Sequence, residues 1–184
     1  MGAPKRNKKK YERPASMWNK ERIDEEHKIK KEYGLKKLGE LWRPASEIRR
    51  VRRNAREVLS GNATEKVGKE IIARLASYNI VSENAIPDDI LVIKPQSLLD
   101  RRLQTVVYKK GLAKTIKQSR QLITHGFISI NGRKIKSPSY LVKKNEENAI
   151  NYYKKFSLDT LPPKTNDAIN EAADKGSEAD VKNE

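Results

Sequence analysis

Cysteine is absent from the 184 residues of this chain. Without thiols the chain has no disulfide framework, no thiolate zinc site and no cysteine nucleophile, and its composition suits a reducing compartment. No apolar run approaches the roughly 18 residues that a membrane span needs. The basic N-terminus is not followed by the apolar stretch of a secretory signal. We therefore expect a cytoplasmic protein that does not interact with membranes.

Motifs of enzyme chemistry are also missing. The sequence has no glycine-rich phosphate loop with its Lys and Ser or Thr, no GxSxG nucleophile elbow and no HExxH zinc motif. Its only histidines are His27 and His125, and a single histidine near a helix end is most often a packing or hydrogen-bonding residue. We predict that the chain is not an enzyme and that it has no catalytic residue, no metal ligand and no cofactor.

Acidic residues are absent from one long segment. Residues 101–144 carry 12 Lys and Arg and no Asp or Glu, in a chain of net charge +16. Residues 1–56 form a second basic region, with 19 Lys and Arg against 8 Asp and Glu, whereas residues 57–100 and 145–184 are net acidic. Ordinary surfaces mix both signs, so two such regions indicate a phosphate-bearing polyanion that is bound at more than one place. The alternative is a basic surface that serves only solubility.

Helical periodicity dominates the first hundred residues. A basic arm rich in Lys, Pro and Asn precedes a helix that we predict from the N-cap residue Asn19 to Gly34. A third helix begins at Thr64, and residues 87–89 mark a loop. Between them a second helix is expected over 46–61, with a buried stripe formed by Ile48, Val51, Ala55, Val58 and Leu59.

The second helix also carries a row of arginines. Arg49, Arg52, Arg53 and Arg56 fall at i, i+3, i+4 and i+7 beside the apolar stripe. Like charges at this spacing repel one another unless an anion neutralises them, and the guanidinium fork suits phosphate oxygens. The row therefore predicts phosphate contacts. The alternative is a solvated face with some pairing to Glu47 or Glu57.

The segment over 97–124 predicts two further helices. Ser97 and Asp100 resemble a capping box, which would start a helix that ends at Gly111. Another helix is expected from Thr115, again with a box partner three residues later, to about residue 124. Its polar row is the leading candidate for a contact face and consists of Lys117, Arg120, Gln121 and Thr124.

After Gly126 the apolar residues no longer recur at helical spacing but at every second position, as in a β-strand. Alternating residues on either side of Asn131-Gly132 predict a β-hairpin, because this dipeptide is the strongest short signal for a two-residue turn. Two more short strands are expected over 139–142 and 148–152. The polar tail that follows is expected to be disordered.

The stretch over 100–142 resembles a known RNA-binding module. Its Arg102-Leu103 pair, its Ser119 to Ile123 run, His125-Gly126 and Ile130 to Gly132 match the compact module named after small-subunit ribosomal protein four. The opening GAPKRNKKKYERP, the KEYGLK and ELWR stretches and the arginine-rich helix resemble the archaeal and eukaryotic branch of that ribosomal protein family. The resemblance covers roughly residues 1–155.

The patterns and the resemblance together imply an α+β fold. A mostly helical N-terminal domain is expected to precede a small RNA-binding module of two helices packed on a short, mainly antiparallel sheet. The expected domains are a basic flexible arm over 1–17, the helical domain over 18–97, the RNA-binding domain over 98–155 and a polar, acidic tail over 156–184.

For function, the resemblance implies a structural constituent of the small ribosomal subunit. Such a protein would be a primary rRNA-binding protein that nucleates subunit assembly by clamping a multi-helix rRNA junction. Its partners would be small-subunit rRNA, neighbouring small-subunit proteins including protein five, and mRNA at the channel where mRNA enters the small subunit. The alternatives are the RNA-binding module of an RNA-modifying enzyme and a helix-turn-helix DNA-binding protein.

The residues predicted to contact rRNA are the basic and polar side chains of these patterns. They are Lys8, Lys9, Lys10, Arg43, Arg49, Arg52, Arg53, Arg56, Arg101, Arg102, Lys109, Lys110, Lys114, Lys117, Arg120, Gln121, Thr124, His125, Arg133 and Lys134.

Overall fold

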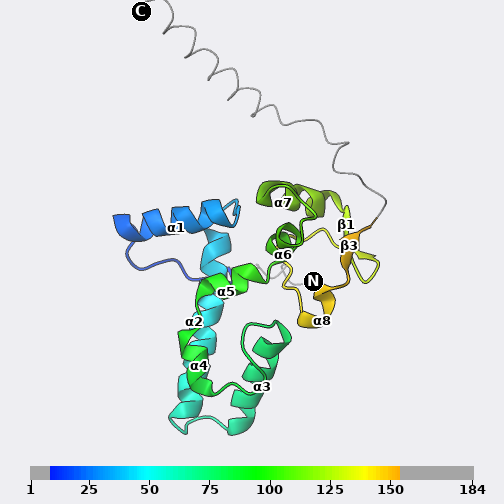
Figure 1. The fold of residues 1–184 in the computed structure, drawn as a ribbon. Helices are drawn as coiled ribbons and strands as arrows, with labels where there is room; N and C mark the ends of the chain where they lie inside the picture. The colour runs from blue at the N-terminus through cyan, green and yellow to red at the C-terminus, as the bar shows by residue number, and fades with distance from the viewer. Residues whose placement is uncertain (1–8, 154–184) are drawn as a thin grey trace, which may run out of the picture. The chain divides into compact units, whose positions relative to one another are not determined.

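A computed structural model describes residues 9–153, so Lys8, the rest of the arm before it and the predicted tail over 156–184 lie outside the described residues. The described part is mostly helical with one small sheet, which confirms the predicted α+β class (Figure 1). Its helices are α1 (Lys20–Glu32), α2 (Gly39–Leu59), α3 (Glu65–Ser77), α4 (Pro87–Val92), α5 (Pro95–Asp100), α6 (Leu103–Lys109), α7 (Ile116–His125) and α8 (Lys144–Glu147). Its strands are β1 (Ile128–Ile130), β2 (Arg133–Lys134) and β3 (Ile150–Tyr152).

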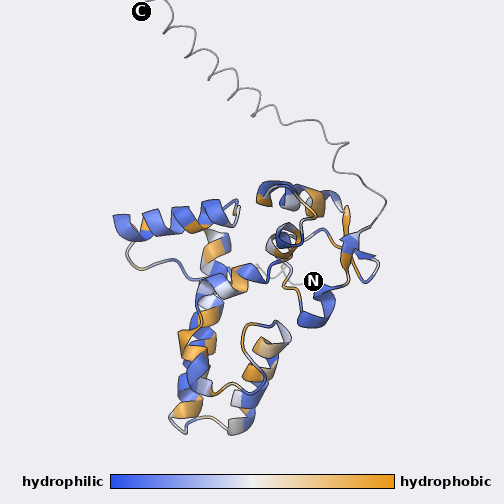
Figure 2. Ribbon diagram, in the orientation of Figure 1, coloured by the Kyte–Doolittle hydropathy of each residue, from blue (hydrophilic) through white to orange (hydrophobic). Residues whose placement is uncertain are grey.

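The first core lies where α2, α3 and α4 pack together. Ala55, Leu75 and Ile90 are buried there, one from each of the three helices, and partly buried residues such as Val51 and Ile71 surround them. Figure 2 shows apolar residues on these three helices, whereas α1 is almost entirely hydrophilic. The predicted apolar stripe of α2 therefore does face a core, except at its end, where Leu59 is exposed.

A second cluster joins α1, α2 and α5. It contains Tyr33, Leu35, Leu41 and Leu99. The turn after α1 comes close to the module, because a Cβ on Gly34 would lie 2.8 Å from Cγ2 of Ile116 on α7. Gly34 also has a positive φ of 57°, which favours glycine.

The module consists of α6, α7 and a three-stranded antiparallel sheet in the order β2-β1-β3. The predicted hairpin is confirmed: Ile130 pairs with Arg133, and Asn131 and Gly132 both have positive φ, as a type I′ turn requires. The inward-facing residues of helices and sheet are almost fully buried, namely Leu103, Val107, Leu122, Ile123, Ile128, Val142 and Ile150. Each such side chain contributes about 1.5–3 kcal/mol of hydrophobic stabilisation when buried.

Two predicted helix starts are confirmed by their caps. The side chain of Asn19 accepts a hydrogen bond from the N–H of Arg22, at 3.1 Å. The hydroxyl of Thr115 accepts one from the N–H of Gln118, at 3.2 Å. Both contacts satisfy a backbone donor that the first turn of a helix leaves free.

The predicted boundaries are wrong at three places that involve proline or a long-range backbone contact. Helix α2 begins at Gly39 instead of near residue 46, and it includes Pro44. Residues 87–89 open α4 instead of forming a loop, because a proline at the first helical position loses no hydrogen bond. The helix expected from Ser97 to Gly111 is two helices, α5 and α6.

The break between α5 and α6 has a structural cause. The N–H of Leu103 donates to the carbonyl of Tyr140, at 2.8 Å, and the N–H of Val142 donates to the carbonyl of Arg101, at 2.9 Å. These bonds replace helical ones at that point. Among the described residues the strand predicted over 139–142 is reduced to one bridge between Arg102 and Leu141, whereas the strand predicted over 148–152 is present as β3.

Candidate nucleic-acid interface

A groove beside α2 gathers positive charge from the arm and the helix. Its volume is about 620 Å³. Tyr11, Glu12, Ser46 and Glu47 contribute to its walls. We call it the basic groove and define it by its cations, which are Lys9, Lys10, Arg43, Arg49, Arg50 and Arg53. Five of these six were predicted as contact residues, and the structure brings them together.

The described part of the arm forms one wall of the basic groove because it is fastened to α2. The ring of Tyr11 lies against Gly39, where a Cβ would be 3.2 Å from Cζ of the tyrosine, and its centroid is 5.9 Å from that of Trp42. The N–H of Glu12 donates to Oγ of Ser46, at 3.0 Å. These contacts set the position of the neighbouring Lys9 and Lys10. The flexibility expected for the arm as a whole stays a prediction.

The arginine row of α2 is divided between different surroundings. Arg49 forms an ion pair with Glu12, at 2.9 Å. Arg52 instead contacts the end of α4, where its guanidinium donates to the carbonyl of Ile93 at 2.6 Å. Arg53 lines the basic groove, whereas Arg56 is exposed and is not among the groove residues. The row is therefore not one continuous exposed face.

Arg50 lines the basic groove although it was not predicted. Arg43, Arg50 and Arg53 are exposed, and no ion pair joins any of them to a described residue. The seven-residue spacing of Arg43 and Arg50 puts both on one side of a continuous helix. That signal was present in the sequence, but the predicted helix began near residue 46 and left Arg43 outside it, whereas α2 begins at Gly39.

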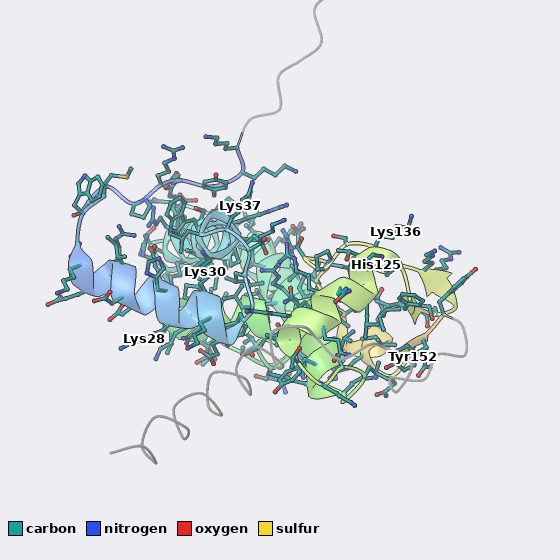
Figure 3. All side chains as sticks on the ribbon, turned by 90° about the horizontal axis from the view of Figure 1, so that it is seen from above. Lys28, Lys30, Lys37, His125, Lys136 and Tyr152 are labelled. Atoms are coloured by element: carbon teal, nitrogen blue, oxygen red, sulfur yellow. The ribbon has the colours of Figure 1, made fainter. Side chains whose placement is uncertain are left out.

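The exposed part of α7 forms a second polar surface. We call it the module face and define it by Lys117, Gln121, Thr124, His125 and Lys134. The first three are spaced at i, i+4 and i+7 on the helix. The hairpin reaches the end of α7, because the side chain of Lys134 passes over Gly126. Figure 3 shows His125 on the same part of the molecule as Lys136, which lies in the segment just after β2.

Arg120, the fourth member of the predicted polar row, faces the N-terminal domain instead. Its guanidinium donates to both carboxylate oxygens of Glu40, at 3.0 and 2.9 Å. Arg102 donates to the same carboxylate at 2.8 Å, and its side chain is only 5% exposed. Partial burial by itself raises the pKa of Glu40, but the hydrogen bonds and charges of Arg120 and Arg102 outweigh that effect and lower the pKa to about 2.

Other cations of the acid-free segment also find partners outside it. Arg101 pairs with Glu147 at 2.8 Å, and Lys109 pairs with Asp100 at 2.8 Å. Lys110 donates to the carbonyl of Glu147. Arg133 is exposed on β2. The absence of carboxylates from 101–144 thus reflects ion pairing across the fold as well as an open basic surface.

Within 9–153 no three His, Asp or Glu side chains gather as they would around a metal ion. No helix of this part is long and apolar enough to cross a membrane.

Comparison with known proteins matches the same part of the chain to an RNA-binding family. The S4 domain family model matches residues 101–148, which hold α6, α7, α8 and the β1–β2 hairpin and end just before β3. The match begins close to the predicted start of the RNA-binding domain, although the predicted domain borders themselves stay a prediction.

Whole-chain relatives are similar over most of their length. The chain is 49% identical over 154 residues to the small ribosomal subunit protein uS4 of Ignicoccus hospitalis, which covers 83% of this chain and 93% of the relative. It is 45% identical to the uS4 protein of Saccharolobus solfataricus, covering 89% and 92%. With the uS4 protein of Saccharolobus islandicus the identity is 43% and the cover is 99% of each chain. The chain therefore belongs to the family of small ribosomal subunit protein uS4, as the resemblance in its sequence predicted.

Proposed function

We propose that the chain is a primary rRNA-binding protein of the small ribosomal subunit, which holds neighbouring RNA helices by their phosphates at two surfaces. The basic groove would take one helix and the module face another. Family membership supports a structural role in the ribosome. The single observation that carries the two-surface model is the basic groove, where Arg43, Arg50 and Arg53 stand exposed without an acidic partner among the described residues.

Phosphate contacts suit these side chains better than base reading does. Exposed cations on two separate surfaces gain most from a partner whose charge is spread along a backbone, and they carry no sequence information by themselves. The deep, narrow major groove of an RNA helix also hides its base edges from side chains. Shape and phosphate spacing would therefore select the site, which fits a junction where several RNA helices meet.

Finer parts of the proposal rest on the family resemblance. Clamping a multi-helix junction would let this chain nucleate assembly of the subunit, because later proteins would bind to RNA that it has already ordered. Neighbouring small-subunit proteins, protein five among them, and mRNA close to its channel would meet the faces that rRNA leaves open. We propose a structural role without catalysis.

A competition experiment separates this proposal from its rivals. The full chain is bound to a transcript of the 5′ domain of an archaeal small-subunit rRNA, and unlabelled RNA duplex, DNA duplex or the same transcript is added. We expect nanomolar binding that only the transcript displaces efficiently. Equal displacement by duplex DNA would instead support a DNA-binding protein, and chemical change of the recovered RNA would support a modifying enzyme.

A further inference from the structure

Beside the basic groove lies a second hollow of different chemistry. Its volume is about 410 Å³, and its floor and walls are largely apolar. We call it the apolar pocket and define it by Tyr11, Gly39, Pro44, Leu98, Ser139 and Leu141. These residues come from the arm, from α2, from α5 and from the segment after the hairpin. The pocket therefore lies where the helical domain meets the module.

The apolar pocket is continuous with the basic groove. Both are lined by Lys10, Tyr11, Arg43 and Glu47. Figure 3 shows Lys37, a further residue of the pocket, beside the described part of the arm. One RNA strand could therefore fill both hollows, because the group in the pocket and the group in the groove would be near neighbours along that strand.

The mouth of the pocket has a net positive charge. Lys10, Lys37 and Arg43 are exposed at its rim. Its two carboxylates are already engaged, Glu40 with Arg102 and Arg120, and Glu47 with Arg74 at 3.1 Å. An occupant should therefore combine a flat or apolar group with negative charge beside it.

We propose that the apolar pocket binds one unstacked nucleobase of the RNA whose phosphates lie in the basic groove. A nucleotide has the required combination of a planar base and an anionic backbone. Folded RNA is recognised through unpaired bases that leave the stack and lie on aromatic side chains, and Tyr11 supplies such a side chain here. The volume is at the small end of the range for ligand pockets, about 300–1,000 Å³, so it suits a single base.

The pocket would give the complex a selectivity that phosphate contacts lack. A regular duplex has no free base to offer, whereas a junction or bulge does. Ser139 is exposed and lines the pocket, and its hydroxyl would offer a hydrogen bond to the edge of the base. This inference rests on the proposed function, because it assumes that RNA occupies the basic groove.

Two substitutions of neighbouring serines test the pocket. The Ser139→Trp variant places an indole at the pocket, and the Ser137→Trp variant places one on an exposed residue of the same loop that does not line the pocket. Circular dichroism and thermal melting establish that both variants fold. Binding of the full chain to the 5′-domain transcript is then measured as a function of salt.

We expect Ser139→Trp to weaken binding to the transcript by about 5- to 150-fold, the range that corresponds to losing one stacked base. Its salt dependence should equal that of the parent, because a base contact releases no counterions. Ser137→Trp should bind like the parent. If both tryptophan variants bind like the parent, the pocket holds no base and the inference is wrong, although the proposed function stands. If the parent itself does not bind the transcript, both fail.

A second measurement uses the absence of natural cysteine. Ser139→Cys and Ser137→Cys variants each carry a single thiol, whose reaction with a maleimide is followed with and without saturating RNA. We expect the transcript, but not an RNA duplex, to slow the reaction of the Ser139→Cys thiol at least tenfold and to leave the Ser137→Cys thiol unchanged. If the Ser139→Cys thiol reacted equally fast in the presence of the transcript and of the duplex, the inference would be overturned. A Ser139→Cys thiol that does not react even without RNA would overturn it as well, because the pocket would then be closed.

Discussion

The carboxylate of Glu40 accepts two hydrogen bonds from the guanidinium of Arg120, at 3.0 and 2.9 Å, across 80 residues of sequence. Glu40 lies in the first turn of α2, and Arg120 lies in the middle of α7. The same carboxylate holds the buried guanidinium of Arg102. One acidic side chain therefore joins the helix that carries the basic groove to the helix that carries the module face.

Replacing Glu40 by Gln is expected to destabilise the fold. The change leaves Arg102, which has almost no contact with solvent, without its anionic partner. We predict a loss of about 1–3 kcal/mol in the free energy of unfolding, measured by urea denaturation, with the figure reduced for the partial exposure of Glu40. Glu57→Gln, which changes an exposed carboxylate of the same helix, is the control and should stay within about 0.5 kcal/mol of the parent.

The same pair predicts how stability depends on pH. In the folded chain the pKa of Glu40 is about 2, below its ordinary value of 4.5. The ion pair thus stabilises the fold fully above pH 4.5, and this contribution disappears as the pH falls through about 2. The difference in unfolding free energy between the parent and Glu40→Gln should be constant from pH 7 to pH 5 and should shrink below pH 4.5. A difference that stays constant down to pH 2 would show that Glu40 is not held by the two arginines.

Glycine at position 34 is expected to be required for the contact between the turn after α1 and the start of α7. Gly34→Ala combines a positive φ with a Cβ only 2.8 Å from Ile116. Gly61→Ala is a matched control, because Gly61 also has a positive φ, 75°, but no atom within 4 Å of the added Cβ. Both should lose about 1 kcal/mol from backbone strain, and Gly34→Ala should lose at least about 1 kcal/mol more from overpacking. Equal thermal melting of the two variants would contradict the close contact.

The module face and Arg120 should respond differently to substitution. Lys117→Gln removes an exposed charge of α7, so we expect weaker RNA binding and unchanged stability. Arg120→Gln breaks the pair with Glu40, so we expect a loss of stability of about 1 kcal/mol or more in the absence of RNA. Denaturation and RNA titration of both variants check this. If Arg120→Gln keeps full stability, its pairing with Glu40 contributes nothing to the fold.

Local signals in the sequence were sufficient for several elements. The caps at Asn19 and Thr115 and the turn at Asn131-Gly132 depend only on neighbouring residues, and all three were predicted correctly. Proline misled the prediction because it ends a helix in some positions and begins one in others. Pro87 stands at the first position of α4, and Pro44 lies inside α2.

Contacts between distant segments were outside what the sequence could show. The interruption between α5 and α6 depends on backbone bonds to residues 138–142, which the local pattern does not reveal. The partners of Arg102 and Arg120 lie on α2, so both looked like open phosphate ligands. The tyrosine of the arm is likewise recognisable as part of the interface only when it is seen to lie against Gly39.

The most direct test of the two-surface model is the salt dependence of RNA binding after two arginines of the basic groove have been replaced by uncharged residues. The Arg50→Gln and Arg53→Gln double variant is compared with the parent and with Arg52→Gln, whose guanidinium is bound to Ile93 instead of facing the groove. Affinity for the 5′-domain transcript is measured over a range of salt concentrations. We predict that the double variant binds more weakly and that its slope of log affinity against log salt is flatter by up to about 0.9 per lost phosphate contact. Arg52→Gln should keep the parent's slope. A double variant with the affinity and the slope of the parent would contradict the assignment of the basic groove to RNA.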